Sequence, residues 1–160
     1  MPGDVTLARL HRILQAVMGW LDYHLHQFII DGTYYGEPHP DYEDWLEMKD
    51  ERRFRLHQVA PGEGFRFTYE YDFGDSWGHT LLVEKVFPPE PGVRYPVCVK
   101  GRRACPPEDV GGIWGYYGFL EAMQDPDHPD HEMYTEWIGG EFDPEAFDLD
   151  EVNAALRALR

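Results

Sequence analysis

The sequence predicts an α+β fold in which helices near both ends of the chain cover a largely antiparallel sheet. Two patterns support this prediction. An alternating aromatic stretch over residues 65–73 opens a central hairpin that reaches about residue 86, and helical spacing of apolar residues occurs both before residue 22 and after residue 115. The length of 160 residues suits one domain with its own core. We therefore expect a single domain over residues 1–160.

The N-terminal stretch carries apolar residues at three- and four-residue steps, which is the spacing of one helix face: Leu7, Leu10, Leu14, Val17, Met18 and Leu21. Asp4 or Thr6 can cap the start of this helix, and Gly19 can end it. Residues 24–30 then alternate and lead into Asp31 and Gly32, a pattern typical of a strand that enters a tight turn.

The central hairpin has the clearest β pattern of the chain. Its first strand alternates polar residues with a row of aromatic ones: Phe65, Phe67, Tyr69, Tyr71 and Phe73. Residues 74–78 supply turn chemistry, and residues 79–86 return as the second strand. Residues 53–59 are predicted as a further strand.

Proline and glycine interrupt the chain after the hairpin, so residues 87–112 are expected to be mostly loop. Three helices are predicted beyond this loop, at about 116–123, 129–138 and 149–159. Asp148 is a suitable cap for the last helix.

Charge restricts the partners of the chain. The net charge of −16 opposes the phosphate backbone, so we expect no direct binding to duplex DNA. Residues 104–156 hold fourteen Asp or Glu and no Lys or Arg, which indicates either a solvated acidic face or a surface for a basic partner. The longest apolar runs are too short to cross a bilayer, and the N-terminus has no secretory pattern. A cytoplasmic location without membrane attachment is therefore expected.

Three stretches stand out for their order and spacing. The first combines Met-Gly-Trp at residues 18–20 with His-Leu-His-Gln-Phe at residues 24–28; the second is Tyr-Asp-Phe-Gly-Asp-Ser-Trp-Gly-His at residues 71–79; and the third is Pro-Pro-Glu-Asp-Val-Gly-Gly at residues 106–112. Together they resemble the plasmid pRiA4b ORF-3-like family. The resemblance covers about residues 5–155. It implies a fold and a mobile-element context, and it implies no particular reaction.

The chain departs from the pattern of that family in two places. Relatives usually carry an additional strand upstream of the segment that begins here at Gly3, so this chain is expected to lack the first strand of the family. An open sheet edge would follow, which predicts a homo-oligomer formed by strand pairing. Many relatives place a cysteine where Val110 stands, which argues against a cysteine-rich metal site in that loop.

Loop carboxylates are the strongest candidates for chemistry, because acids beside glycine or proline are held on loops where acid/base or cation-binding work is done. The catalytic candidates are Asp72, Asp75, His79, Glu108 and Asp109. We expect residues 72–79 and residues 108–112 to lie side by side as one cleft. The expected binding residues in and near that cleft are Trp77, Gly111, Gly112 and Trp114. The alternative is that these acids and glycines only form turns.

Metal ligation is a weaker expectation. His79, Cys98 and Cys105 could supply three zinc ligands, although their spacing matches no standard finger and two free thiols are expected in a reducing compartment. His128 and His131 could share a helical face as a second site. His24 and His26 alternate along one strand and could converge on one ligand. In each case an ordinary structural role is the favoured alternative, so no cofactor is assigned.

Three functions remain open at this point. The first is an acidic interaction or accessory domain that binds a protein through its acidic C-terminal half and its aromatic sheet. The second is a small hydrolase or nuclease-like enzyme that uses loop carboxylates to hold a divalent cation. The third is a nucleic-acid mimic that occupies the groove of a basic protein.

Overall fold

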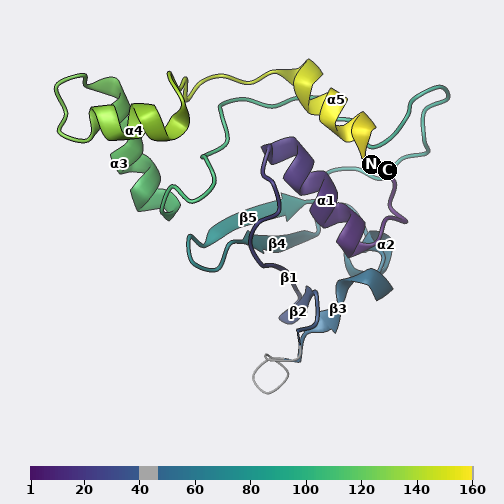
Figure 1. The fold of residues 1–160 in the computed structure, drawn as a ribbon. Coiled ribbons are helices and arrows are strands. Elements are labelled where there is room, and N and C mark those ends of the chain that lie inside the picture. The colour runs from purple at the N-terminus through teal and green to yellow at the C-terminus, as the bar shows by residue number, and fades with distance from the viewer. Residues whose placement is uncertain (40–46, 160) are drawn as a thin grey trace.

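The computed structural model describes residues 1–39 and 47–159 of the chain (Figure 1). Its elements follow in the order α1 (Leu7–Met18), β1 (His26–Ile30), β2 (Thr33–Gly36), β3 (Lys49–Asp50), the 3-10 helix η2 (Glu51–Arg53), α2 (Leu56–Val59), β4 (Arg66–Tyr71), β5 (Trp77–Leu82), α3 (Gly112–Gln124), α4 (His131–Ile138) and α5 (Leu149–Ala158). Helices therefore bracket a strand-rich middle, as the sequence predicts.

The strands form one sheet of five in the order β3-β2-β1-β4-β5. Every neighbouring pair is antiparallel except β2 and β3, which are parallel. Asp31 and Gly32 both adopt positive φ values, 52° and 73°, and this left-handed pair makes the tight turn between β1 and β2. The predicted largely antiparallel sheet is confirmed.

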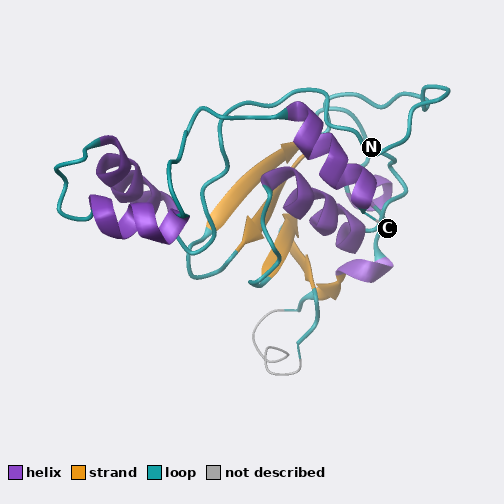
Figure 2. Ribbon diagram, turned by 45° about the horizontal axis from the view of Figure 1, so that its top comes forward, coloured by secondary structure: helices purple, strands orange, loops and turns teal. Residues whose placement is uncertain are grey.

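The aromatic row of the central hairpin lies in the core. Phe67, Tyr69 and Tyr71 on β4 are buried, and Tyr69 pairs in register with Phe28 of β1. Helix α1 covers this face with Leu7 and Leu10, and α5 packs against α1 (Figure 2). Burial of each large apolar side chain contributes about 1.5–3 kcal/mol, so this face holds the fold together and is not available as a binding surface.

The residues predicted to begin and end α1 do so. The Thr6 hydroxyl accepts a hydrogen bond from the Arg9 backbone N–H at 3.1 Å, and Gly19 ends the helix in a left-handed conformation with φ 74°.

The predicted strand over residues 53–59 is wrong. That stretch forms the end of η2 and the short helix α2. The backbone N–H of Arg55 donates to the side-chain oxygen of Gln58 at 2.9 Å, and Leu56 and Ala60, one helical turn apart, are both buried. Capping and a four-residue burial period therefore outweigh the strand pattern.

The C-terminal half divides into two parts. Helix α5 joins the core through buried Leu156, whereas α3 and α4 pack against each other at a distance from the sheet (Figures 1 and 2). Helix α3 begins at Gly112, four residues before its predicted start, because Gly111 in a left-handed conformation provides its N-terminal boundary. Within the described part of the chain, no helix has both the length and the apolar character needed to cross a membrane.

Strand β5 forms one edge of the sheet. The expectation of a homo-oligomer through an open strand edge stays a prediction. Light scattering across a concentration series measures it directly.

Candidate functional site

Four side chains from three separate segments converge beside the end of β4. His24 Nε2 lies 2.6 Å from Asp109 Oδ1, 3.5 Å from Asp72 Oδ2 and 4.0 Å from Glu108 Oε2. We call these four residues the His24 cluster. Two of its segments are joined by the sheet, because the backbone N–H of Asp72 donates to the carbonyl of Leu25 at 2.9 Å, just beyond the paired residues of β1 and β4.

Asp72 is held rigidly by its own turn. It has a left-handed backbone with φ 58°, and its Oδ1 accepts hydrogen bonds from the backbone N–H groups of Gly74 at 3.0 Å and Asp75 at 3.2 Å. Only 7% of the residue is exposed, and its second oxygen, Oδ2, faces His24. One oxygen therefore fixes the carboxylate while the other points into the cluster.

Glu108 is also anchored from several directions. Its Oε1 accepts from the backbone N–H of Leu21 at 2.8 Å, and the Tyr71 hydroxyl lies 3.1 Å and 3.2 Å from its two oxygens. Burial, followed by the hydrogen bond to Glu108, raises the pKa of Tyr71, so the phenol keeps its proton and donates it to the carboxylate. The indole N–H of Trp20 donates to the carbonyl of Pro106 at 2.9 Å and ties the same loop to the end of α1.

Asp109 forms the open side of the cluster. Its side chain is 60% exposed, and its backbone is left-handed with φ 60°. Desolvation alone would lower the pKa of His24, but the hydrogen bond to Asp109 and the charges of Asp72, Asp109 and Glu108 outweigh it and raise that pKa. One imidazole thus faces three carboxylates, which leaves an excess of negative charge that attracts cations.

The two predicted loop stretches do lie side by side. The backbone N–H of Gly111 donates to Asp75 Oδ2 at 3.0 Å. A Cβ atom added to Gly112 would lie 2.6 Å from the carbonyl oxygen of Asp75, and the φ of Gly112 is 70°. Glycine is therefore required where the start of α3 meets the hairpin turn.

Three other predicted site residues, Asp75, Trp77 and His79, serve the packing around this junction, whereas Trp114 does not. Asp75 fastens the two loops together, and Trp77 lies against Trp20 with ring centroids 6.2 Å apart. His79 Nδ1 lies 3.1 Å from the carbonyl oxygen of Tyr69, and burial lowers the pKa of this histidine. Trp114 points away from the core with 85% of its surface exposed.

The predicted cysteine and histidine metal ligands do not gather. Within residues 1–39 and 47–159, two groups of three potential ligands have ligand atoms within 4.8 Å of one another, and neither contains a cysteine, His79, His128 or His131. Burial raises the pKa of Cys105 to about 12, which disfavours a thiolate. His128 Nδ1 accepts from the backbone N–H of Asp130, and His131 Nδ1 lies 2.7 Å from the carbonyl oxygen of Ala122, so both histidines take part in the local structure around the start of α4.

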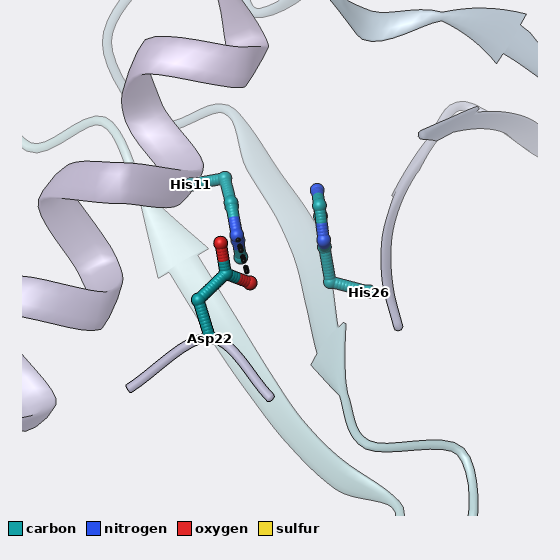
Figure 3. A group of neighbouring side chains, drawn as sticks. All are labelled: His11, Asp22 and His26. Atoms are coloured by element: carbon teal, nitrogen blue, oxygen red, sulfur yellow. Dashed lines mark hydrogen bonds and ion pairs between the residues drawn. The ribbon is translucent and has the colours of Figure 1, made fainter. Parts of the chain in front are cut away.

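A second histidine cluster, which the sequence did not reveal, lies under α1 (Figure 3). The rings of His11 and His26 stack with centroids 3.4 Å apart and planes 3° from parallel. His11 Nε2 lies 2.8 Å from Asp22 Oδ1, and His26 Nε2 lies 2.8 Å from Glu51 Oε2. We call these four residues the His11 cluster. Its sequence signal is the placement of His11 four residues after Leu7 on the buried face of α1.

Hydrogen bonding fixes the protonation of His11. Gln15 Oε1 accepts from the backbone N–H of Asp22, so Gln15 Nε2 donates to the Tyr69 hydroxyl at 3.0 Å. Having accepted this bond, the hydroxyl donates its own proton to His11 Nδ1 at 2.8 Å. His11 is then a neutral imidazole whose Nε2–H donates to Asp22.

This arrangement is unsuited to a metal ion. Two imidazoles that share a zinc ion point their nitrogens at it from roughly tetrahedral directions, and parallel rings at 3.4 Å cannot do so. Both nitrogens of His11 are already engaged. His24 and His26, whose convergence on one ligand is the less favoured possibility from the sequence, do not meet: His24 belongs to the open cluster and His26 to the buried one.

Comparison with known proteins identifies relatives of this chain in sequence and in fold. The profile of the family described as "Plasmid pRiA4b ORF-3-like protein" matches residues 1–151. The chain is 39% identical over 162 residues to "Uncharacterized protein y4hQ" of Sinorhizobium fredii, an alignment that covers 99% of this chain and 81% of that protein. Among solved structures, it is similar to "Protein of Unknown Function MM3350" from Methanosarcina mazei Go1, with a TM-score of 0.81 and 37% identity over 94% of this chain and 85% of the other. The chain therefore belongs to the plasmid pRiA4b ORF-3-like family.

Proposed function

We propose that this protein binds a divalent cation at the His24 cluster and uses the ion to activate water in a hydrolytic reaction. The observation that carries the proposal is the approach of three carboxylates to within 4.0 Å of His24 Nε2. Once His24 Nε2 has released its proton, one imidazole nitrogen with several carboxylate oxygens is a ligand set that suits Mn²⁺, Mg²⁺ or Zn²⁺.

The openness of the cluster favours a reactive ion over a purely structural one. Structural metal sites are closed by protein ligands, whereas reactive sites keep a position for water or substrate. Asp109 is 60% exposed, so an ion bound beside it faces solvent.

The surrounding residues support proton transfer from such a water. An ion of this kind lowers the pKa of its bound water and makes hydroxide available near neutral pH. Glu108, held by Tyr71 and by the backbone of Leu21, stands at the edge of the cluster and is placed to accept the proton. Hydrolysis at this site would form a bond from the water oxygen to an ester carbon or phosphorus and break the bond to the leaving oxygen, to which Glu108 would return the proton.

Charge narrows the substrate class. The net charge of −16 repels polyanions, so a small ester fits this site better than duplex DNA does. The alternative of an interaction domain built on the aromatic sheet loses support, because Tyr69 and Tyr71 are buried under α1.

Calorimetric titration of the metal-free protein with MnCl₂ tests the cation site. We expect His24→Ala and Asp109→Asn each to weaken binding by at least about tenfold, as loss of a metal contact does. Asp75→Asn is the matched control: it removes a neighbouring charge, but its amide oxygen can still accept from Gly111 N–H, so affinity should be unchanged. Equal Mn²⁺ affinity of the parent protein and all three variants would refute the site.

Hydrolysis is tested separately, with bis-p-nitrophenyl phosphate and p-nitrophenyl acetate as probes in the presence of Mn²⁺. Glu108→Gln should reduce turnover while the titration still detects the ion. Cation binding without turnover of either ester would contradict the proposed hydrolysis and leave only the proposed cation binding.

A further inference from the structure

Helix α3 presents an apolar face to solvent. Ile113, Trp114 and Tyr117 are 55%, 85% and 56% exposed, and the rings of Trp114 and Tyr117 have centroids 6.3 Å apart. Residues 113 and 117 are one helical turn apart, so the three side chains form one patch, which we call the α3 apolar face. Tryptophan is highly buried on average, and such exposure of large apolar neighbours marks an interaction site.

The opposite side of α3 makes the packing contacts that hold the helix in place. Phe119 and Ala122 are buried, and the Phe119 ring packs edge-on against Tyr134 and Trp137 of α4 with centroids 5.3 Å and 5.8 Å apart. Since α3 is anchored through these contacts, the three exposed side chains of the α3 apolar face are not needed to hold the helix in place.

The part of the chain that carries this face is acidic. Glu121 is exposed one helical turn beyond Tyr117, and Asp109 is exposed three residues before α3 begins. Between residues 104 and 156 there are fourteen acids and no Lys or Arg. Nucleic acids and anionic membranes also use aromatic contacts, but this charge repels them.

We propose that the α3 apolar face binds a basic, amphipathic helical segment of another protein. Apolar side chains of the segment would pack on Trp114 and Tyr117, and its Lys or Arg residues would pair with Glu121 and the acids that precede α3. Exposed aromatic anchors surrounded by polar groups are typical of interface hot spots. The inference does not depend on cation binding, although the docked segment would lie close to the His24 cluster because α3 starts three residues after Asp109.

A labelled 14-residue Lys/Leu amphipathic peptide is the probe, measured by fluorescence anisotropy. We expect the protein to bind it and Trp114→Ala to weaken binding at least about tenfold, the effect of losing a hot spot. Tyr117→Ser should weaken it by a smaller factor, and a Glu/Leu peptide of the same length should not bind. Phe87→Ala is the matched control, because Phe87 is a 66% exposed aromatic residue in the loop before α3.

Two outcomes would overturn the proposal. Equal peptide affinity for the parent protein and for Trp114→Ala, with both folded by circular dichroism, would mean that charge alone attracts the probe. A concentration-dependent dimer in light scattering that Trp114→Ala dissolves would identify a second copy of this chain as the occupant instead.

Discussion

The two histidine clusters of this protein contain the same kinds of side chain and differ in what those side chains can still do. In the His11 cluster, His11 is buried and both of its nitrogens are engaged, by Tyr69 and by Asp22. In the His24 cluster, His24 meets carboxylates from two loops, and Asp109 leaves one side open to solvent.

The difference shows that short distances between potential ligands do not by themselves make a metal site. The rings of His11 and His26 lie face to face, so their in-plane lone pairs run side by side and cannot meet at one ion. Asp72 instead uses one oxygen to anchor itself and aims the other at His24. The direction of free lone pairs therefore separates a structural network from a candidate site.

The largest difference between the clusters should appear in stability. His11→Ala leaves a cavity and removes the partner of the Tyr69 hydroxyl, so we expect a loss of about 2–4 kcal/mol in the free energy of unfolding. His24→Ala, at the rim, should cost under about 1 kcal/mol. Urea unfolding measures both values, and equal losses would abolish the distinction between the clusters.

The junction between the two loops should depend on Gly112. Gly112→Ala places a methyl group against Asp75 and forces a left-handed backbone on alanine, with an expected cost of about 1–3 kcal/mol. Gly118→Ala in the same helix meets nothing within 4 Å and should stabilise the protein by about 0.5–1 kcal/mol. Thermal melts report both changes. A neutral Gly112→Ala would mean that the loops can separate freely.

The clusters should also differ in their response to pH. Burial, followed by the charge of His26, lowers the pKa of His11, although Asp22 and Glu51 oppose the shift. The unfolded chain then binds more protons than the folded one at acidic pH, so this residue makes the protein less stable as the pH falls below the ordinary histidine value of about 6.5.

Histidine NMR titration of the metal-free protein is the direct measurement. The His11 resonance should titrate below about pH 6.5 and the His24 resonance above it, in line with their lowered and raised pKa values. Coincident titration midpoints would contradict the assignment of a buried neutral ring and an open charged one.

The smallest expected effect tests the neutral state of His11. Asp22→Asn keeps an oxygen that can accept the His11 Nε2–H, so the loss in the free energy of unfolding should stay below about 1 kcal/mol, because a neutral acceptor replaces an ionised one. A loss of about 1.5–3 kcal/mol would instead indicate an ion pair between Asp22 and a protonated ring. Chemical denaturation at pH 8 and at pH 5.5 distinguishes these results.

The sequence determined the local structure of this protein. The apolar spacing of α1, its cap at Thr6, its end at Gly19 and the hairpin of β4 and β5 all follow from short-range patterns, because backbone geometry and turn chemistry act within a few residues. It also identified Asp72, Glu108 and Asp109 as loop acids and the two loops as neighbours.

Only the tertiary structure decided which side chains meet. The fold brings His24 to Asp109, 85 positions away in sequence, and places His11 against His26 rather than pairing His26 with His24. It leaves Asp75 and His79 outside the His24 cluster although both lie in the same predicted turn region. These contacts depend on the pairing of β1 with β4 and on how α1 and the loop before α3 pack over the end of the sheet. Such long-range arrangements minimise the free energy of the whole core, and no local pattern of residues encodes them.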